Sequence, residues 1–177
     1  MAQAASMPTI RPATPADRDA VVTIYREAIR FLNAQGNRQW SETIYPTPRT
    51  ADDALAAGTL HVVQLDGVIC GTVILNEYQH PGYAELSWRY SDGPQLVMHT
   101  LAVHPAYGGR GIAQQIVGYA LDFARAQGYP AMRLDVFPPN TTAVRLYQKF
   151  GFEYVGKVYF DYKEEGYRWY DCYELKL

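Results

Sequence analysis

Residues 108–113 form a glycine-rich stretch, Gly-Gly-Arg-Gly-Ile-Ala, between an apolar segment that ends at Val103 and a segment with helical periodicity. Glycines leave backbone N–H groups free to face a ligand, and a helix N-terminus adds the positive end of its dipole. Such a turn can hold a pyrophosphate with few lysines. It is not a P-loop, because no Lys-Ser or Lys-Thr follows the glycines, and Gln114 replaces the last glycine of the dinucleotide fingerprint GxGxxG. The stretch therefore predicts a phosphate-binding turn of a third kind.

A second group of residues that could do chemistry begins after a Pro-Pro pair. Asn140 opens a segment with helical periodicity that carries Ala143 and Tyr147 and ends at Gly151. An asparagine in this position can cap the helix or bind a ligand, and a tyrosine can donate a proton or pack in the core. The residues alone leave both pairs of alternatives open.

The composition limits the kinds of protein that this chain can be. With 177 residues, 48% of them hydrophobic and 19% charged, we expect one globular domain over residues 8–177 and a flexible N-terminus over residues 1–7. A net charge of −2 argues against nucleic acid as a partner, and we expect no signal peptide or membrane span. Cys70 and Cys172 lie in strand-like apolar segments, which predicts buried free thiols and a cytoplasmic location. The histidines lack the spacing that is typical of a metal site.

A mixed set of strands and helices must position these residues. Asp66-Gly67 between two apolar runs is a strong hairpin signal, and the strand–helix–strand order over residues 96–137 implies a right-handed parallel crossover. Periodicity and turn residues predict strands at 10–13, 60–65, 68–76, 83–88, 96–103, 131–137, 152–160 and 168–177, and helices at 15–34, 49–57, 112–127 and 141–150. The fold class is therefore α/β (mixed α+β), antiparallel in its first half and parallel in the middle.

The two motifs resemble those of the GNAT N-acetyltransferase superfamily. Leu-Ala-Val-His-Pro at residues 101–105, followed by the glycine-rich stretch, is similar to its acetyl-CoA-binding motif, [Q/R]-x-x-G-x-[G/A]. The pattern Asn140-x-x-Ala143-x-x-x-Tyr147-x-x-x-Gly-Phe is similar to its second motif. Spacing and element order also match, so the resemblance covers nearly the whole chain. It implies a GNAT fold, with a central mixed sheet of about seven strands, a splayed parallel pair at the cofactor site and about four flanking helices.

The resemblance assigns acetyl-CoA to these motifs as the cofactor. It implies cofactor contacts from Leu101, Ala102, Val103, Gly108, Gly109, Arg110, Gly111, Ile112, Ala113, Asn140, Ala143 and Tyr147. Backbone groups of Leu101 and Val103 would bind the pantetheine and the acetyl carbonyl, and amides of residues 108–113 would hold the pyrophosphate. One residue departs from the pattern, because Gly108 stands where the family usually has Gln or Arg. Its backbone N–H remains, and Arg110 is near enough in sequence to compensate.

The resemblance also suggests catalytic residues. Tyr147 matches the tyrosine that protonates the departing CoA thiolate. An acceptor amine with a pKa of about 10.4 is protonated at neutral pH, so a general base is required. Glu85, expected in the middle of a strand, and His99, expected on the same strand face as Leu101, are the candidates, with Glu77 behind them.

The predicted reaction moves an acetyl group from acetyl-CoA to a primary amine, of a small molecule or a peptide N-terminus, by direct attack in a ternary complex. Trp40 and Tyr45 lie in the loop where the family builds its acceptor site, and the net charge of −2 favours a cationic acceptor. A catalytically inert acyl-CoA sensor is the alternative. Phosphoryl transfer is disfavoured, because its Lys and Mg²⁺-binding Ser/Thr are absent. We expect no nucleic acid, membrane or metal partner, and the resemblance is compatible with a homodimer.

Overall fold

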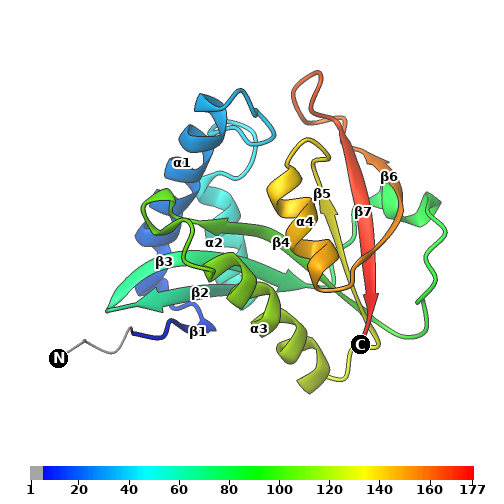
Figure 1. Ribbon diagram of the computed structural model, residues 1–177, viewed down its shortest axis with the longest axis horizontal. Coiled ribbons are helices and arrows are strands. Elements are labelled where there is room, and N and C mark those ends of the chain that lie inside the picture. Colours follow the sequence, from blue (N-terminus) through cyan, green and yellow to red (C-terminus); the bar gives the residue numbers. More distant parts are fainter. Residues whose placement is uncertain (1–5) are drawn as a thin grey trace.

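The computed structural model describes residues 6–177, so most of the predicted flexible N-terminus of residues 1–7 lies outside the described residues. Over this range the chain forms a strand-rich fold with helices on both faces (Figure 1). The strands are β1 (Thr9–Pro12), β2 (Leu60–Leu65), β3 (Val68–Asn76), β4 (Gln95–Val103), β5 (Ala131–Val136), β6 (Glu153–Tyr159) and β7 (Trp169–Lys176). The α-helices are α1 (Arg18–Ala34), α2 (Pro48–Ala56), α3 (Ile112–Ala126) and α4 (Thr141–Lys149), and the 3-10 helices are η1 (Pro15–Asp17), η2 (Pro81–Glu85) and η3 (Pro105–Tyr107).

The described strands form one seven-stranded sheet in the order β1-β2-β3-β4-β5-β7-β6. Neighbouring strands are antiparallel except for β4 and β5, which are parallel, so the predicted mixed sheet is confirmed. Asp66 and Gly67 join β2 to β3 with left-handed φ angles of 51° and 80°, which the predicted tight hairpin requires. The terminal hairpin is also present, with β7 between β5 and β6.

The helices cover opposite faces of the sheet (Figure 1). Val62 of β2 belongs to the apolar cluster under α1, whereas its neighbour Val63 belongs to the cluster under α3. Because successive strand residues point to opposite faces, α1 and α3 lie on different sides of the sheet. A third cluster, rich in aromatic residues such as Tyr83, Phe160 and Tyr170, packs around the C-terminal half of the sheet.

The predicted strand at residues 83–88 is wrong. Pro81 starts the 3-10 helix η2 instead, because its ring fixes φ and it has no N–H for a strand ladder. Tyr83 is buried in the aromatic cluster, and the Trp88 indole donates a hydrogen bond to the Tyr83 carbonyl at 2.7 Å, which folds the segment back on itself. Glu85 is exposed at the end of η2 rather than in a strand. Packing of the aromatic side chains therefore overrides the strand propensity of this segment.

β4 contains a bulge at Thr100. Its register against β3 slips by one residue there, and Thr100 has a left-handed φ of 51°. The extra residue reverses the side-chain alternation, so that Met98 and Leu101 both pack with the cluster under α3 while Ala102 packs under α1. His99 therefore points to the face opposite Leu101. The prediction that these two residues share a face is wrong, because it assumed an unbroken strand.

Candidate active site

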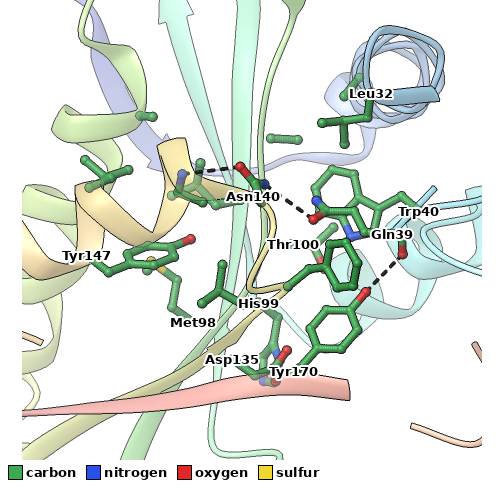
Figure 2. Close-up of a pocket in the computed structure, with 18 of the residues that line it drawn as sticks. Leu32, Gln39, Trp40, Met98, His99, Thr100, Asp135, Asn140, Tyr147 and Tyr170 are labelled. Carbon is green, nitrogen blue, oxygen red and sulfur yellow. Dashed lines mark hydrogen bonds between the residues drawn. The ribbon is translucent and has the colours of Figure 1, made fainter. Parts of the chain in front are cut away.

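A cleft of about 900 Å³ opens where β4 and β5 stop pairing (Figure 2). The parallel ladder joins only Gln95–Val97 to Ala131–Arg133, and beyond it the strands diverge. This divergence releases the β5-facing backbone groups of residues 98–103 from the ladder, as the resemblance implied for a splayed pair. We call the wall formed by residues 101–114 and α4 the α4 side. We call the wall formed by residues 39–45 and 160–170, with the inward residues of β5, the tyrosine side.

The glycine-rich turn lies at the edge of the α4 side. Gly108 and Gly111 line the cleft, and α3 begins directly after Gly111. Gly109 and Gly111 have left-handed φ angles of 73° and 74°, and a Cβ atom on either would meet no atom within 4 Å. The Gly108 N–H donates to the Pro105 carbonyl at 3.0 Å, so it is not free as the sequence analysis expected. The rest of the turn is open, with the amides that follow Gly108 and a helix N-terminus facing a possible anion site.

Nine of the 12 residues predicted to contact a cofactor line this cleft, and Gly109, Arg110 and Ile112 do not. Ile112 is buried in the core under α3, and the Arg110 guanidinium lies 5.1 Å from the centre of the Tyr107 ring. Two basic residues that the sequence analysis missed, Arg145 and Lys149, line the cleft from α4. Their spacing of four residues on a helix was the signal that could have found them.

Asn140 caps α4 and links the two sides of the cleft. Its Oδ1 accepts a hydrogen bond from the Ala143 amide at 3.3 Å, which confirms the helix-cap alternative. Its Nδ2 donates to Gln39 Oε1 at 3.4 Å, so the cap also anchors the loop that carries the predicted acceptor residues (Figure 2). Both Asn140 and Gln39 line the cleft.

Tyr147 combines the two alternatives that its sequence position left open. Its ring is 8% exposed and lies edge-on to Phe152 at 6.0 Å between ring centres, so it belongs to the core. Its hydroxyl nevertheless points into the cleft (Figure 2). Burial raises the pKa of Tyr147 well above the ordinary value for tyrosine, so the hydroxyl keeps its proton at neutral pH and can donate it.

Trp40 and Tyr45 line the tyrosine side, where the sequence analysis expected an acceptor site. The Tyr45 hydroxyl contacts the hydroxyl of Thr100 at the β4 bulge. Burial raises the pKa of Tyr45 to about 12, so this contact is between neutral groups at pH 7. On the same side, Lys163 and Tyr170 both donate hydrogen bonds to the Gln39 carbonyl, at 3.2 and 3.1 Å.

His99 is the only one of the three candidate bases, all of which are described, that lines the cleft. Its Nε2 lies 3.1 Å from the Tyr78 carbonyl, which can only accept, so Nε2 carries the proton and Nδ1 keeps its lone pair. Burial lowers the pKa of His99, so the ring is neutral at pH 7. Glu85 is exposed on η2, and Glu77 accepts a hydrogen bond from the Tyr129 hydroxyl at 2.8 Å outside the cleft.

Asp135 lines the cleft from β5 and was missed by the sequence analysis. The Tyr83 hydroxyl donates to its Oδ2 at 2.5 Å. Asp135 alternates with Arg133 on β5, and that pair of charged residues in an otherwise apolar strand was a usable signal for a polar inner face.

Among residues 6–177 there is no group of three His, Cys, Asp or Glu side chains that could hold a metal ion. None of the described helices is both long and apolar enough to cross a membrane.

The chain belongs to the acetyltransferase (GNAT) family, whose family model matches residues 22–152. The fold and the cleft agree with that assignment, and the protein is therefore an acyltransferase of this family. A solved GNAT-family acetyltransferase from Streptococcus agalactiae superposes with a TM-score of 0.83 at 23% identity, and the match covers 98% of each chain. YncA of Salmonella typhimurium, solved with its cofactor acetyl-CoA, superposes with a TM-score of 0.67 at 23% identity, covering 97% of this chain and 95% of YncA.

Relatives by sequence include a named acetyltransferase. An L-methionine sulfoximine/L-methionine sulfone acetyltransferase from S. typhimurium is 28% identical over 145 residues, which are 81% of this chain and 79% of the relative. A stretch of 76 residues is 48% identical to a protein of Mycobacterium leprae and spans only 20% of that relative.

Proposed function

We propose that the protein is an acetyl-CoA-dependent N-acetyltransferase. In this proposal it moves an acetyl group to a primary amine, on a small molecule or a peptide N-terminus, by direct attack in a ternary complex. One observation carries the proposal. The cleft runs from the glycine-rich turn, along the part of β4 that does not pair with β5, to the Tyr147 hydroxyl. These features fit, in order, a pyrophosphate, an extended arm that contains amides, and a leaving sulfur. Bound acetyl-CoA would supply an activated acetyl thioester.

The α4 side binds the cofactor mainly through the backbone. Amides of residues 109–113 and the N-terminus of α3 hold the pyrophosphate, and Arg145 and Lys149 add positive charge nearby. Backbone groups of Leu101 and Val103, released from the ladder, bind the pantetheine arm as a sheet edge binds an added strand. A backbone N–H of this segment also polarises the acetyl carbonyl.

The chain's own residues move two protons. Nδ1 of His99 removes a proton from the acceptor ammonium, because this nitrogen keeps its lone pair and His99 lines the cleft. The Tyr147 hydroxyl donates a proton to the leaving sulfur, which avoids expelling a bare thiolate into an apolar wedge. Glu85 has no part in this proposal, because it is exposed and does not line the cleft.

The tyrosine side receives the acceptor amine. The S. typhimurium relative carries the name of an acetyltransferase for two methionine derivatives, which supports a small amino compound as the acceptor. Both cysteines are buried and free, which supports a cytoplasmic location. An inert acyl-CoA sensor is less well supported, because such a protein needs no proton donor at the position of Tyr147.

The test is thiol release from acetyl-CoA with a panel of primary amines, alongside calorimetric titration of CoA. We expect CoA binding, and thiol release that depends on one class of amine. CoA binding without release for any amine would support the sensor, and absence of CoA binding would reject both alternatives. Tyr119→Phe is the matched control for Tyr147→Phe. The Tyr119 hydroxyl contacts His61 Nδ1 at 2.9 Å, and Tyr119 does not line the cleft.

A further inference from the structure

Lys163 is a buried cation in the tyrosine side of the cleft. Lys163 is 6% exposed and lines the cleft. Its Nζ donates one hydrogen bond, to the Gln39 carbonyl at 3.2 Å. An ammonium has three N–H donors, so this backbone oxygen satisfies only one of them. A lysine is almost never fully buried unless it is paired, so the position needs an explanation.

No carboxylate of the described residues lies within 4.0 Å of the Lys163 ammonium. The adjacent Glu164 pairs instead with Arg38, at 3.0 Å. Asp135, the acidic residue among the described residues that line the cleft, is engaged by the Tyr83 hydroxyl. The protein therefore places a positive charge in the cleft and leaves it without an ionic partner of its own.

Three tyrosine rings surround this charge. Nζ lies 4.9, 5.1 and 5.7 Å from the ring centres of Tyr45, Tyr170 and Tyr162. Aromatic faces attract a cation without neutralising it, so they hold the ammonium in place while its remaining N–H donors stay free. The same rings could otherwise have formed a cage for a cationic ligand, but Lys163 already occupies that position.

Tyr45 connects this charge to the reaction centre. Its ring face contacts the Lys163 ammonium, and its hydroxyl contacts Thr100 at the β4 bulge, next to Leu101. The ammonium is thus separated from the bulge by one phenol ring. An acceptor whose amine reaches the β4 bulge can place a group a few bonds away beside Lys163.

We propose that Lys163 binds a carboxylate of the acceptor, so that the preferred acceptors are amino acids rather than simple cationic amines. This inference rests on the proposed function and differs from the expectation of a cationic acceptor drawn from the net charge. The carboxylate accepts hydrogen bonds from the free N–H donors of Lys163 and supplies the missing counter-charge. A polyamine would instead bring a second positive charge against the lysine.

The protonation state of Lys163 is consistent with this role. Burial lowers the pKa of Lys163 to about 8, and Asp135 opposes that shift. The side chain is therefore mostly cationic at pH 7. A bound carboxylate would favour the charged form further.

The test compares L-methionine with L-methioninamide, and L-leucine with L-leucinamide, in wild type, Lys163→Met and Lys163→Arg. We expect Lys163→Met to lower kcat/KM for the acids by about 10- to 100-fold, mainly through KM, and to leave the amides nearly unchanged. Lys163→Arg should retain part of the preference for acids. The kcat/KM of each substrate is compared across variants, so the effect of the lower ammonium pKa of the amides is the same in every variant. Lys157→Met is the control. The Lys157 ammonium donates to Asp171 at 2.6 Å, and neither residue lines the cleft.

Equal losses for acids and amides in Lys163→Met would overturn the proposal and indicate a structural or general-base role. A wild type whose KM for the acids, expressed as the concentration of free amine, is no lower than for the amides would overturn it without any variant, even if Lys163→Met fails to fold. If no amine of the wider panel releases thiol either, the proposed function fails, and calorimetry with N-acetyl-L-methionine still tests the carboxylate site. Binding to wild type that Lys163→Met loses supports the carboxylate site, and equal or absent binding rejects it.

Discussion

The two sides of the cleft are built in different ways. The α4 side consists of two continuous segments, residues 101–114 and α4, and offers backbone amides and helix-borne cations. The tyrosine side is assembled from side chains of separate segments, and Tyr170 bonds to Gln39 across 131 residues of sequence. Local chain geometry makes the first side, and tertiary packing makes the second. Chains that share the turn can therefore share a donor site while differing in their acceptors.

The two sides also differ in electrostatics. The amides of the turn do not titrate, so binding through them should depend little on pH. On the tyrosine side burial lowers the pKa of Lys163 and raises that of Tyr45, and it also lowers the pKa of His99, which lines the cleft from β4. Displaced pKa values of this kind concentrate at functional sites.

The largest effect is expected at the proton donor, where the two sides meet. Tyr147→Phe should lower kcat by about 100-fold, because it removes a general acid but keeps the ring in the core. The affinity for CoA should stay unchanged, as the turn holds the phosphates. Steady-state kinetics and CoA calorimetry measure the two effects, and an unchanged kcat would remove the acid role.

The next effect is expected at His99. His99→Gln should lower kcat/KM by about tenfold or more at pH 7, because glutamine can still donate to the Tyr78 carbonyl but cannot take a proton. The loss should shrink as pH approaches about 10, since more of the acceptor is then already a free amine. A loss that stays constant across the pH profile would contradict the role of a base.

A smaller effect, confined to the α4 side, is expected at the turn. Gly111→Val should weaken CoA binding by about tenfold, because a β-branched residue strains a left-handed position at about 1–2 kcal/mol and displaces the amides. Gly58→Val is the matched control, with a φ of 68° and equally open space, away from the cleft. Both variants should lose similar stability in urea unfolding. Equal losses of CoA affinity would show that the turn has no special part in binding.

The smallest effect is one on stability, and it concerns the tyrosine side. The pKa of Lys163 is about 8 in the folded chain, below its ordinary value, so the unfolded chain binds the proton more tightly. The buried charge therefore lowers the free energy of unfolding. This loss of stability is full below about pH 8 and disappears as pH rises through about 10.5. Lys163→Met should therefore be more stable than wild type by about 1–2 kcal/mol at pH 7, with a smaller gain at pH 9.5.

Urea unfolding at the two pH values measures this difference, with Lys157→Met as the control. A destabilised Lys163→Met at pH 7 would mean that the ammonium is a net stabilising anchor between Gln39 and the tyrosine rings. A gain at pH 7 would mean that the tyrosine side holds its charge at the expense of stability, as functional sites often do.

The sequence predicts those parts of the molecule that depend on local signals. The Asp66-Gly67 hairpin, the turn before α3 and the helix that carries Tyr147 were all predicted, because turn residues, caps and periodicity lie within a few residues of one another. The strand at 83–88 was wrong, because the burial of Tyr83 depends on distant aromatic partners.

The face of His99 was wrong for a similar reason. A bulge at Thr100 leaves no mark that strand periodicity can detect, yet it turns every side chain on one part of β4 to the other face. Asp135 and Lys163 were missed because their importance comes from burial, and burial follows from tertiary packing. The tyrosine side was consequently much less predictable than the α4 side.

The most direct test of this account is a crystal structure of the protein with CoA. We expect the pyrophosphate on the amides of residues 109–113, the pantetheine arm between β4 and β5, and the sulfur beside the Tyr147 hydroxyl. The tyrosine side, including Lys163, should remain open for the acceptor. CoA bound across the tyrosine rings, or outside the β4–β5 cleft, would contradict the division of the cleft into a donor side and an acceptor side.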